Sequence, residues 1–368
     1  MRFPRGIASR PCANGKTVDH NTALIAGGSG LIGRRIADHL IAAGNWEVIG
    51  LARRPPPAQS MRWIAVDLTD LEDCRRKLDG LAAVTHVFYA ARFDHPEGRL
   101  ESVEVNAAML RNLITALEPV VGVKHVHAVH GSKYYGHQLG PVGLPLREGS
   151  PRAPAANYYY EQEDFLRERS HGKAWSYTTS RPHAFCDPAI DHPRSIGLAI
   201  AVFAAIQREL GEPLDFPGSA PAYQARTQFT DLALLARAIV WMAQEPRCAN
   251  QAFNVVNGDY PRWSELWPRF ASWFGLEVGI PCKIRLVDYM ADKGRVWDEI
   301  VKKHGLRPTR LDTLALWAYG DYQLTPEWDV MSAMLKARAL GFQETVDSSA
   351  MFIRQFEHYR AEKIIPQV

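Results

Sequence analysis

The chain has 368 residues, enough for a full α/β domain and a second lobe. Hydrophobic residues make up 46% and charged residues 23%, the proportions of a soluble globular protein. The formal net charge of +3 is close to neutral, so neither nucleic acid nor a membrane surface is expected as a partner. No apolar run approaches the length of a membrane-spanning helix.

The cysteines are scattered and contain no C-x-x-C pair: Cys12, Cys74, Cys186, Cys248 and Cys282. This pattern disfavours a metal site or a disulfide framework, and it fits the reducing environment of the cytoplasm. Residues 1–20 contain several basic residues but no apolar segment, so they do not indicate a secretory signal. We expect them to form a disordered or loosely ordered extension.

The first predicted strand runs into a glycine-rich turn. Apolar residues 22–26 are followed directly by Gly27-x-x-Gly30-x-x-Gly33 and then by a helical pattern. Gly27 permits the tight turn, Gly30 lets a pyrophosphate approach the backbone, and Gly33 lets the helix pack on the strand. The helix has apolar residues at helical spacing: Leu31, Ile32, Ile36, Leu40 and Ile41. The N-terminus of such a helix attracts phosphate, so the turn predicts a dinucleotide site.

The second predicted strand, residues 47–52, ends at two arginines. A site that prefers NAD carries an acidic residue here to accept the ribose hydroxyls, and none is present. Arg53 and Arg54 instead suit a 2′-phosphate, through their charge and planar donors. The sequence therefore favours NADP(H); the alternative is a pair of solvated arginines before a proline-rich loop.

Strands and helices continue to alternate through the first half of the chain. Further strands are expected at 61–66, 84–91 and 124–129, with helices at 71–78 and 103–117. This pattern predicts a Rossmann-type, doubly wound parallel sheet with ligands at the carboxyl ends of its strands. Beyond residue 185 prolines become frequent, and we expect helices at 196–210 and 232–243 and a strand at 252–256.

We therefore divide the chain into three parts. Residues 1–20 are the extension, and residues 21–185 are an NADP(H)-binding domain that includes the candidate catalytic residues. Residues 186–368 form a smaller, mostly helical substrate lobe, of which about 225–260 returns to the first domain.

Short-chain dehydrogenases usually carry a catalytic Tyr-x-x-x-Lys on one helix, and this chain does not. Four positions beyond the tyrosines of the run 158–160 stand Gln162, Glu163 and Asp164. A lysine occurs instead at Lys133, in Gly-Ser-Lys-Tyr-Tyr-Gly just after the strand that ends at Val129. Ordinary members place a catalytic serine in this segment.

Together, these motifs make the chain resemble the progesterone 5β-reductase/iridoid synthase family, which are atypical extended short-chain reductases. Further agreement comes from the segments Arg181-Pro182-His183, residues 252–259 and residues 296–301. The resemblance covers about residues 21–365. It implies NADPH-dependent reduction of a C=C bond conjugated to a carbonyl, with a small enone or enal as substrate.

By this resemblance Tyr159 binds the carbonyl oxygen and Lys133 is its catalytic partner. Hydride addition to the β-carbon moves negative charge onto that oxygen, and a phenol donor with a nearby ammonium stabilises it. A cation close to Tyr159 in a dry site would also lower the pKa of the phenol. Tyr158 and Tyr160 are expected to be packing residues, since only one hydroxyl can hold the carbonyl.

The resemblance also implies further cofactor contacts. Asp67 would bind the adenine amino group and Leu68 would flank the ring, while Ala90, Ala91 and Arg92 would meet the pyrophosphate and ribose. Arg92 could equally be an exposed loop residue. Pro182 and His183 would lie beside the nicotinamide, although a histidine in a loop is more often structural.

Two departures from the family pattern bear on the substrate. Tyr158 stands where the family has Phe, and Tyr159 follows Lys133 at a shorter spacing than in plant members, so the loop 136–151 could alter the pocket. Two other functions stay open: a nucleotide-sugar epimerase or dehydratase, which should carry Tyr-x-x-x-Lys, and a non-catalytic NADPH sensor, which should lack the Lys and Tyr pair. A homodimeric state also stays open.

Overall fold

The computed structural model describes residues 21–57, 61–93, 101–119 and 122–367; the expected extension, residues 1–20, lies outside them. Its largest sheet has seven parallel strands in the order β10-β6-β5-β4-β1-β2-β3. The strands are β1 (Asn21–Ala26), β2 (Trp46–Ala52), β3 (Arg62–Ala65), β4 (His86–Tyr89), β5 (His125–Val129), β6 (Ser176–Arg181) and β10 (Gln251–Asn254). This is the strand order of a doubly wound dinucleotide fold with one added edge strand, so the predicted fold class is confirmed.

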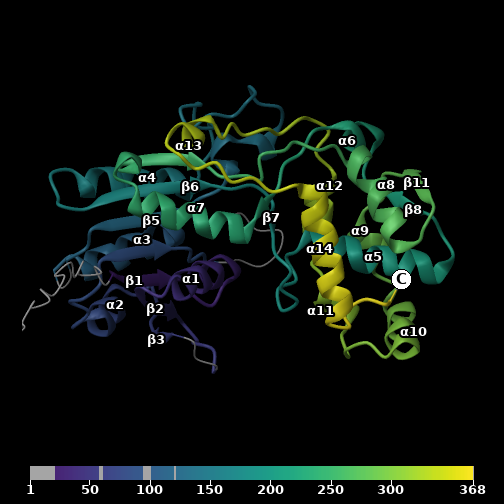
Figure 1. The fold of residues 1–368 in the computed structure, drawn as a ribbon, viewed down its shortest axis with the longest axis horizontal. Coiled ribbons are helices and arrows are strands. Elements are labelled where there is room, and N and C mark those ends of the chain that lie inside the picture. Colours follow the sequence, from purple (N-terminus) through teal and green to yellow (C-terminus); the bar gives the residue numbers. More distant parts are fainter. Residues whose placement is uncertain (1–20, 58–60, 94–100, 120–121, 368) are drawn as a thin grey trace, which may run out of the picture.

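Helices cover both faces of this sheet (Figure 1). On one face lie α1 (Leu31–Ala43) and α7 (Leu232–Gln244), and on the other lie α2 (Leu71–Leu78), α3 (Val103–Leu117) and α4 (Tyr158–Ser170). Alternate residues of β1 serve the two layers, because Ala23 and Ile25 join the first core while Leu24 and Ala26 join the second. Burial on both faces explains why these strands read as continuous apolar runs.

The predicted elements of the first half agree with the structure to within three residues at each end. Two small parallel pairs were not predicted: β7 (Phe185–Cys186) with β9 (Thr230–Asp231), and β8 (Leu214–Phe216) with β11 (Val278–Pro281). Strands of two to four residues are too short to show a period of two, so the sequence carries no signal for them.

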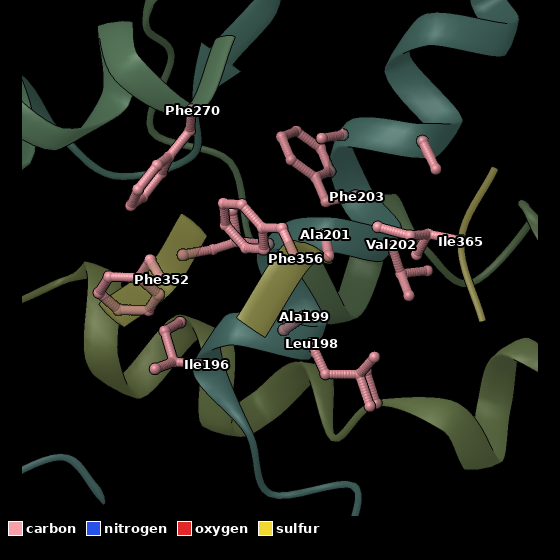
Figure 2. Packing of buried hydrophobic residues seen from close by; sticks show 14 of the residues in the cluster. Ile196, Leu198, Ala199, Ala201, Val202, Phe203, Phe270, Phe352, Phe356 and Ile365 are labelled. Carbon is pink, nitrogen blue, oxygen red and sulfur yellow. The ribbon is translucent and has the colours of Figure 1, made fainter. Parts of the chain in front are cut away.

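A second core lies in the C-terminal half, built on α5 (Ile196–Leu210), α8 (Trp263–Phe274) and α14 (Ser348–Ala361). Figure 2 shows Phe352 and Phe356 of α14 beside Phe270, whose ring centroid lies 5.2 Å from each of theirs. The remaining helices are α6 (Ala220–Gln224), α9 (Leu286–Tyr289), α10 (Gly294–His304), α11 (Leu311–Leu314), α12 (Trp317–Leu324) and α13 (Leu335–Ala339). Across the described ranges, no helix is both long and apolar enough to span a membrane.

Two arginine–aspartate pairs tie the two halves together beside the glycine turn. Arg34 of α1 contacts both carboxylate oxygens of Asp191, at 2.8 and 3.0 Å. Arg35 contacts those of Asp187 at 2.6 and 3.0 Å. Bidentate pairs of this kind fix orientation as well as distance, so the segment after β7 is held against α1.

Candidate active site

The glycine turn packs as tightly as its sequence predicts. Gly27 has φ +78°, and a Cβ atom there would lie 2.8 Å from the backbone of Ala90. A Cβ on Gly33 would lie 2.2 Å from the carbonyl oxygen of Gly27. The next helix, α1, starts at Leu31; its N-cap residue, Gly30, provides no side-chain cap, and its first turn has no acidic residue. The N–H groups of that turn are therefore available to an anion.

A cavity of about 300 Å³ opens over this turn. Most of the predicted cofactor residues line it: Gly27, Gly30, Leu31, Ile32, Arg53, Asp67, Leu68, Ala90, Ala91 and Arg92. Gly33 lies beneath the turn, where it lets α1 approach the strand. Tyr158, Tyr159 and His130 line the same cavity, so one continuous groove joins the glycine turn to the tyrosine cluster.

The end of β2 carries a basic hollow next to this groove. Arg53 lines both, and Arg54 lines the hollow together with Arg76 and Lys77. The Asp67 carboxylate borders both as well, and it accepts hydrogen bonds from the backbone and hydroxyl of Thr69 at 2.9 and 2.7 Å. Arg53, Arg54, Arg76 and Lys77 outnumber the two carboxylates of the hollow, Asp67 and Asp73, so the hollow is a candidate site for an anionic group.

Lys133 and Tyr159 stand on two different segments that one side chain joins. Lys133 lies in a short 3-10 turn after β5, and Tyr159 lies in the first turn of α4. The Asn157 side chain donates to the carbonyl oxygen of Lys133 at 3.2 Å and accepts from the backbone N–H of Tyr159 at 3.0 Å. The Tyr159 hydroxyl faces Gly131, where an added Cβ would lie 3.1 Å from it.

The ammonium of Lys133 has acidic and aromatic neighbours that the sequence did not reveal. Its Nζ lies 3.5 Å from Glu101 Oε1, which also accepts from Arg92 at 2.8 Å. It lies 5.3 Å from the ring centroid of Tyr322, a residue of α12. The second half of the chain thus contributes directly to the surroundings of Lys133.

Tyr159 is almost completely buried, and its ring stacks on His130 with a centroid distance of 4.9 Å. Burial raises the pKa of the Tyr159 phenol, and the charge of Glu101 adds to this rise, while a hydrogen bond with Tyr158 and the charge of Arg92 oppose it. The expectation of a lowered pKa is therefore wrong in sign, because the loss of solvation outweighs that hydrogen bond and the charge of Arg92. The phenol is held in its protonated, hydrogen-bond-donating form.

A second cavity, of about 110 Å³, lies between the two halves of the chain. His137 and His183 line it from the first half, and Arg226, Trp263, Tyr322 and Trp328 are among the residues that line it from the second. His183 thus faces this second cavity, and Pro182 accepts a hydrogen bond from the backbone of Ser132 at 2.8 Å. Tyr322 connects the two sites, since it also contacts Lys133.

Several solved structures share the fold of this chain. A superfamily member from Agrobacterium tumefaciens with bound NAD superposes with a TM-score of 0.64 at 16% identity, covering 93% of this chain and 98% of that one. UDP-glucose 4-epimerase from Thermus thermophilus gives a TM-score of 0.63 at 19% identity, covering 92% and 99%. At such identities the agreement concerns the fold alone.

Sequence comparison then gives the family. The family described as "PRISE-like Rossmann-fold domain" matches residues 64–366. The chain is 34% identical to 3-oxo-Delta(4,5)-steroid 5-beta-reductase of Arabidopsis thaliana, covering 94% of this chain and 93% of that protein. It is 33% identical to (S)-8-oxocitronellyl enol synthase CYC2 of Camptotheca acuminata, covering 99% and 96%. The chain belongs to this family, so the resemblance seen in the sequence is confirmed.

Proposed function

We propose that this protein is an NADPH-dependent reductase of C=C bonds conjugated to a carbonyl, acting on small enones or enals. The observation that carries the proposal is Tyr159, which lines a groove that begins at an uncapped helix N-terminus and which Asn157 links to Lys133. The names of the relatives, a steroid 5-beta-reductase and an enol synthase, support the same reaction class.

NADP(H) fits the groove on two features of the chain. The first turn of α1 offers N–H groups without a competing carboxylate, and Gly27 leaves no room for a side chain. Arg53 and Arg54 offer donors for a 2′-phosphate at the end of β2. When bound, NADPH supplies the hydride. The residues named for the adenine and pyrophosphate contacts are part of this proposal, and so is Pro182 beside the nicotinamide, whereas His183 faces the second cavity.

In the reaction that we infer, hydride adds to the β-carbon and the electron pair of the C=C bond moves onto the carbonyl oxygen. Tyr159 donates its O–H to that oxygen, and its raised pKa keeps the proton on the phenol. Lys133 adds positive charge, which requires its ammonium to turn from Glu101 towards the substrate. A proton taken from water and added at the α-carbon of the enolate completes the saturated carbonyl compound.

The test is to follow the absorbance of NADPH with a panel of enones, enals and Δ4-3-ketosteroids. Consumption of NADPH together with formation of the saturated ketone supports the proposal. Tight NADPH binding without oxidation by any member of the panel would reject it and favour the sensor. Epimerisation of a nucleotide sugar without net NADPH consumption would favour the epimerase alternative.

A further inference from the structure

Three buried polar residues form a hydrogen-bonded cluster on the wall of the second cavity. Ser132 Oγ lies 2.6 Å from His183 Nδ1 and 3.0 Å from His137 Nε2. The two imidazole rings lie 4.8 Å apart, and both line the cavity. The Lys133 and Tyr159 mechanism uses none of these side chains.

The hydrogen bonds of this cluster must run in one direction. Burial lowers the pKa of both histidines, that of His137 to about 4, so both rings are neutral and each carries one N–H. Ser132 is buried, and a buried hydroxyl proton without an acceptor is costly. The hydroxyl therefore donates to one ring and accepts from the other.

The direction of these hydrogen bonds decides which of the two remaining ring nitrogens, His137 Nδ1 and His183 Nε2, is a donor and which is an acceptor. If Ser132 donates to His183, then His183 Nε2 carries a proton and His137 Nδ1 is an acceptor; the opposite direction exchanges the two roles. Among the described residues, neither nitrogen has a hydrogen-bond partner in the protein. Neither is a fully buried polar atom that lacks a partner, so both are accessible. The cavity wall therefore presents one donor and one acceptor from adjacent rings.

We propose that this pair recognises a hydroxyl group of the substrate, so that the preferred substrates are enones or enals that carry an alcohol away from the conjugated bond. A hydroxyl both donates and accepts, and it can satisfy both nitrogens when water is displaced. A carbonyl oxygen only accepts and would leave one nitrogen without a partner. This inference rests on the proposed function and deepens it, since Tyr322 joins the cavity to the surroundings of Lys133.

The experiment compares matched substrates that differ in one group. One set consists of three steroids: androst-4-en-3-one, testosterone and androst-4-ene-3,17-dione. At carbon 17 the first has no oxygen, the second a hydroxyl and the third a ketone. A second set of smaller cyclic enones, with and without a ring hydroxyl, tests shorter distances between the enone and the hydroxyl. For at least one pair, we expect kcat/KM to be about tenfold higher for the alcohol than for the compound without the hydroxyl. This is the factor that one additional hydrogen bond provides. Ratios within about twofold for every pair would overturn the inference.

Variants assign the preference to the cluster. His137→Phe removes both ring nitrogens of His137. Ser132→Ala removes the hydroxyl that is hydrogen-bonded to both histidine rings. His137→Phe should bring the alcohol-to-plain ratio close to one, and a general loss of activity cancels in that ratio. Ser132→Ala keeps both cavity nitrogens but no longer fixes which of them donates, so the ratio should fall only in part. The control Thr325→Val changes the same cavity outside the cluster and should keep the preference. A preference that survives unchanged in His137→Phe, or is lost in Thr325→Val, would overturn the assignment.

Binding provides a readout that is independent of turnover. Titration of the NADP-loaded protein with testosterone and androst-4-en-3-one should show tighter binding of the alcohol in the wild type and no difference in His137→Phe. If no enone is reduced, the proposed function fails, and the titration still decides whether the cavity recognises a hydroxyl. Equal affinity for both steroids and for each smaller pair would contradict the inference.

Discussion

The side-chain amide of Asn157 donates a hydrogen bond to the backbone carbonyl of Lys133 across 3.2 Å. The same side chain caps α4 by accepting from the backbone of Tyr159. One residue thus fixes the turn after β5 against the start of α4. This link ties Lys133 to Tyr159 although the two residues do not share a helix.

Asn157→Asp separates the two roles of this residue. The carboxylate still accepts from the Tyr159 N–H, so the helix cap and the stability of the fold should be retained. It cannot donate to the Lys133 carbonyl, and it repels that oxygen. We expect kcat to fall about tenfold with NADPH affinity unchanged, measured by steady-state kinetics and cofactor titration.

Asn157→Ala is the companion variant, because it loses the cap as well. Its free energy of unfolding in urea should drop by about 1 kcal/mol relative to Asn157→Asp. Full activity in Asn157→Asp would show that the link to Lys133 is dispensable.

Tyr159→Phe removes the proposed donor to the carbonyl oxygen. The rate should fall by about 10²–10³, while NADPH binding is retained because the glycine turn is untouched. Tyr158→Phe is the matched control: it deletes a neighbouring buried hydroxyl and should keep most of the activity. Comparable losses in the two variants would contradict the assignment of the donor to Tyr159.

The sequence was sufficient for the fold because the main signals are local. The run before Gly27, the glycine turn and the alternation of strands and helices each depend on neighbouring residues. The contacts around the ammonium of Lys133, in contrast, join residues that are far apart in the sequence. Glu101 lies in a loop before α3 and Tyr322 lies in α12, and no periodicity connects either of them with Lys133. Such pairs follow from the tertiary fold.

The same distinction explains the error in the pKa of Tyr159. The sequence indicated a cation nearby, which lowers a phenol pKa, but it could not give the depth of burial, which raises it. The role of Ser132 was missed for a similar reason. Its partner His183 lies after a different strand, β6, and they meet only because β5 and β6 are adjacent in the sheet.

Arg53→Ala tests the preference for NADPH. Arg53 lines both the groove and the basic hollow, so its loss should weaken NADPH binding about tenfold or more and leave NADH binding nearly unchanged. Arg62→Ala, an exposed arginine on the neighbouring strand β3, should affect neither cofactor. Fluorescence titration with both cofactors measures the effect, and equal weakening of NADPH and NADH would rule out a 2′-phosphate contact.

Because several histidines are buried, we expect the free energy of unfolding to decrease in mild acid. Burial lowers the pKa of His86 and His137 to about 4 and that of His125 and His130 to about 3. In the unfolded chain these side chains titrate near their ordinary pKa of about 6.5, so below that pH the unfolded state binds more protons. Each such histidine lowers the free energy of unfolding by up to about 1.4 kcal/mol per pH unit, from pH 6.5 down to its folded pKa.

Urea unfolding at pH 7.5, 6.0 and 5.0 measures this loss in a range where most carboxylates do not titrate. His127 provides the matched variant, because burial also lowers its pKa and it is hydrogen-bonded to Thr178 and Ser180. His127→Gln should be less stable at pH 7.5, since it disturbs those bonds, yet its stability should fall less steeply towards pH 5.0 because one titrating group is gone. A wild-type stability that is constant between pH 7.5 and 5.0 would show that these histidines are not held neutral by the fold.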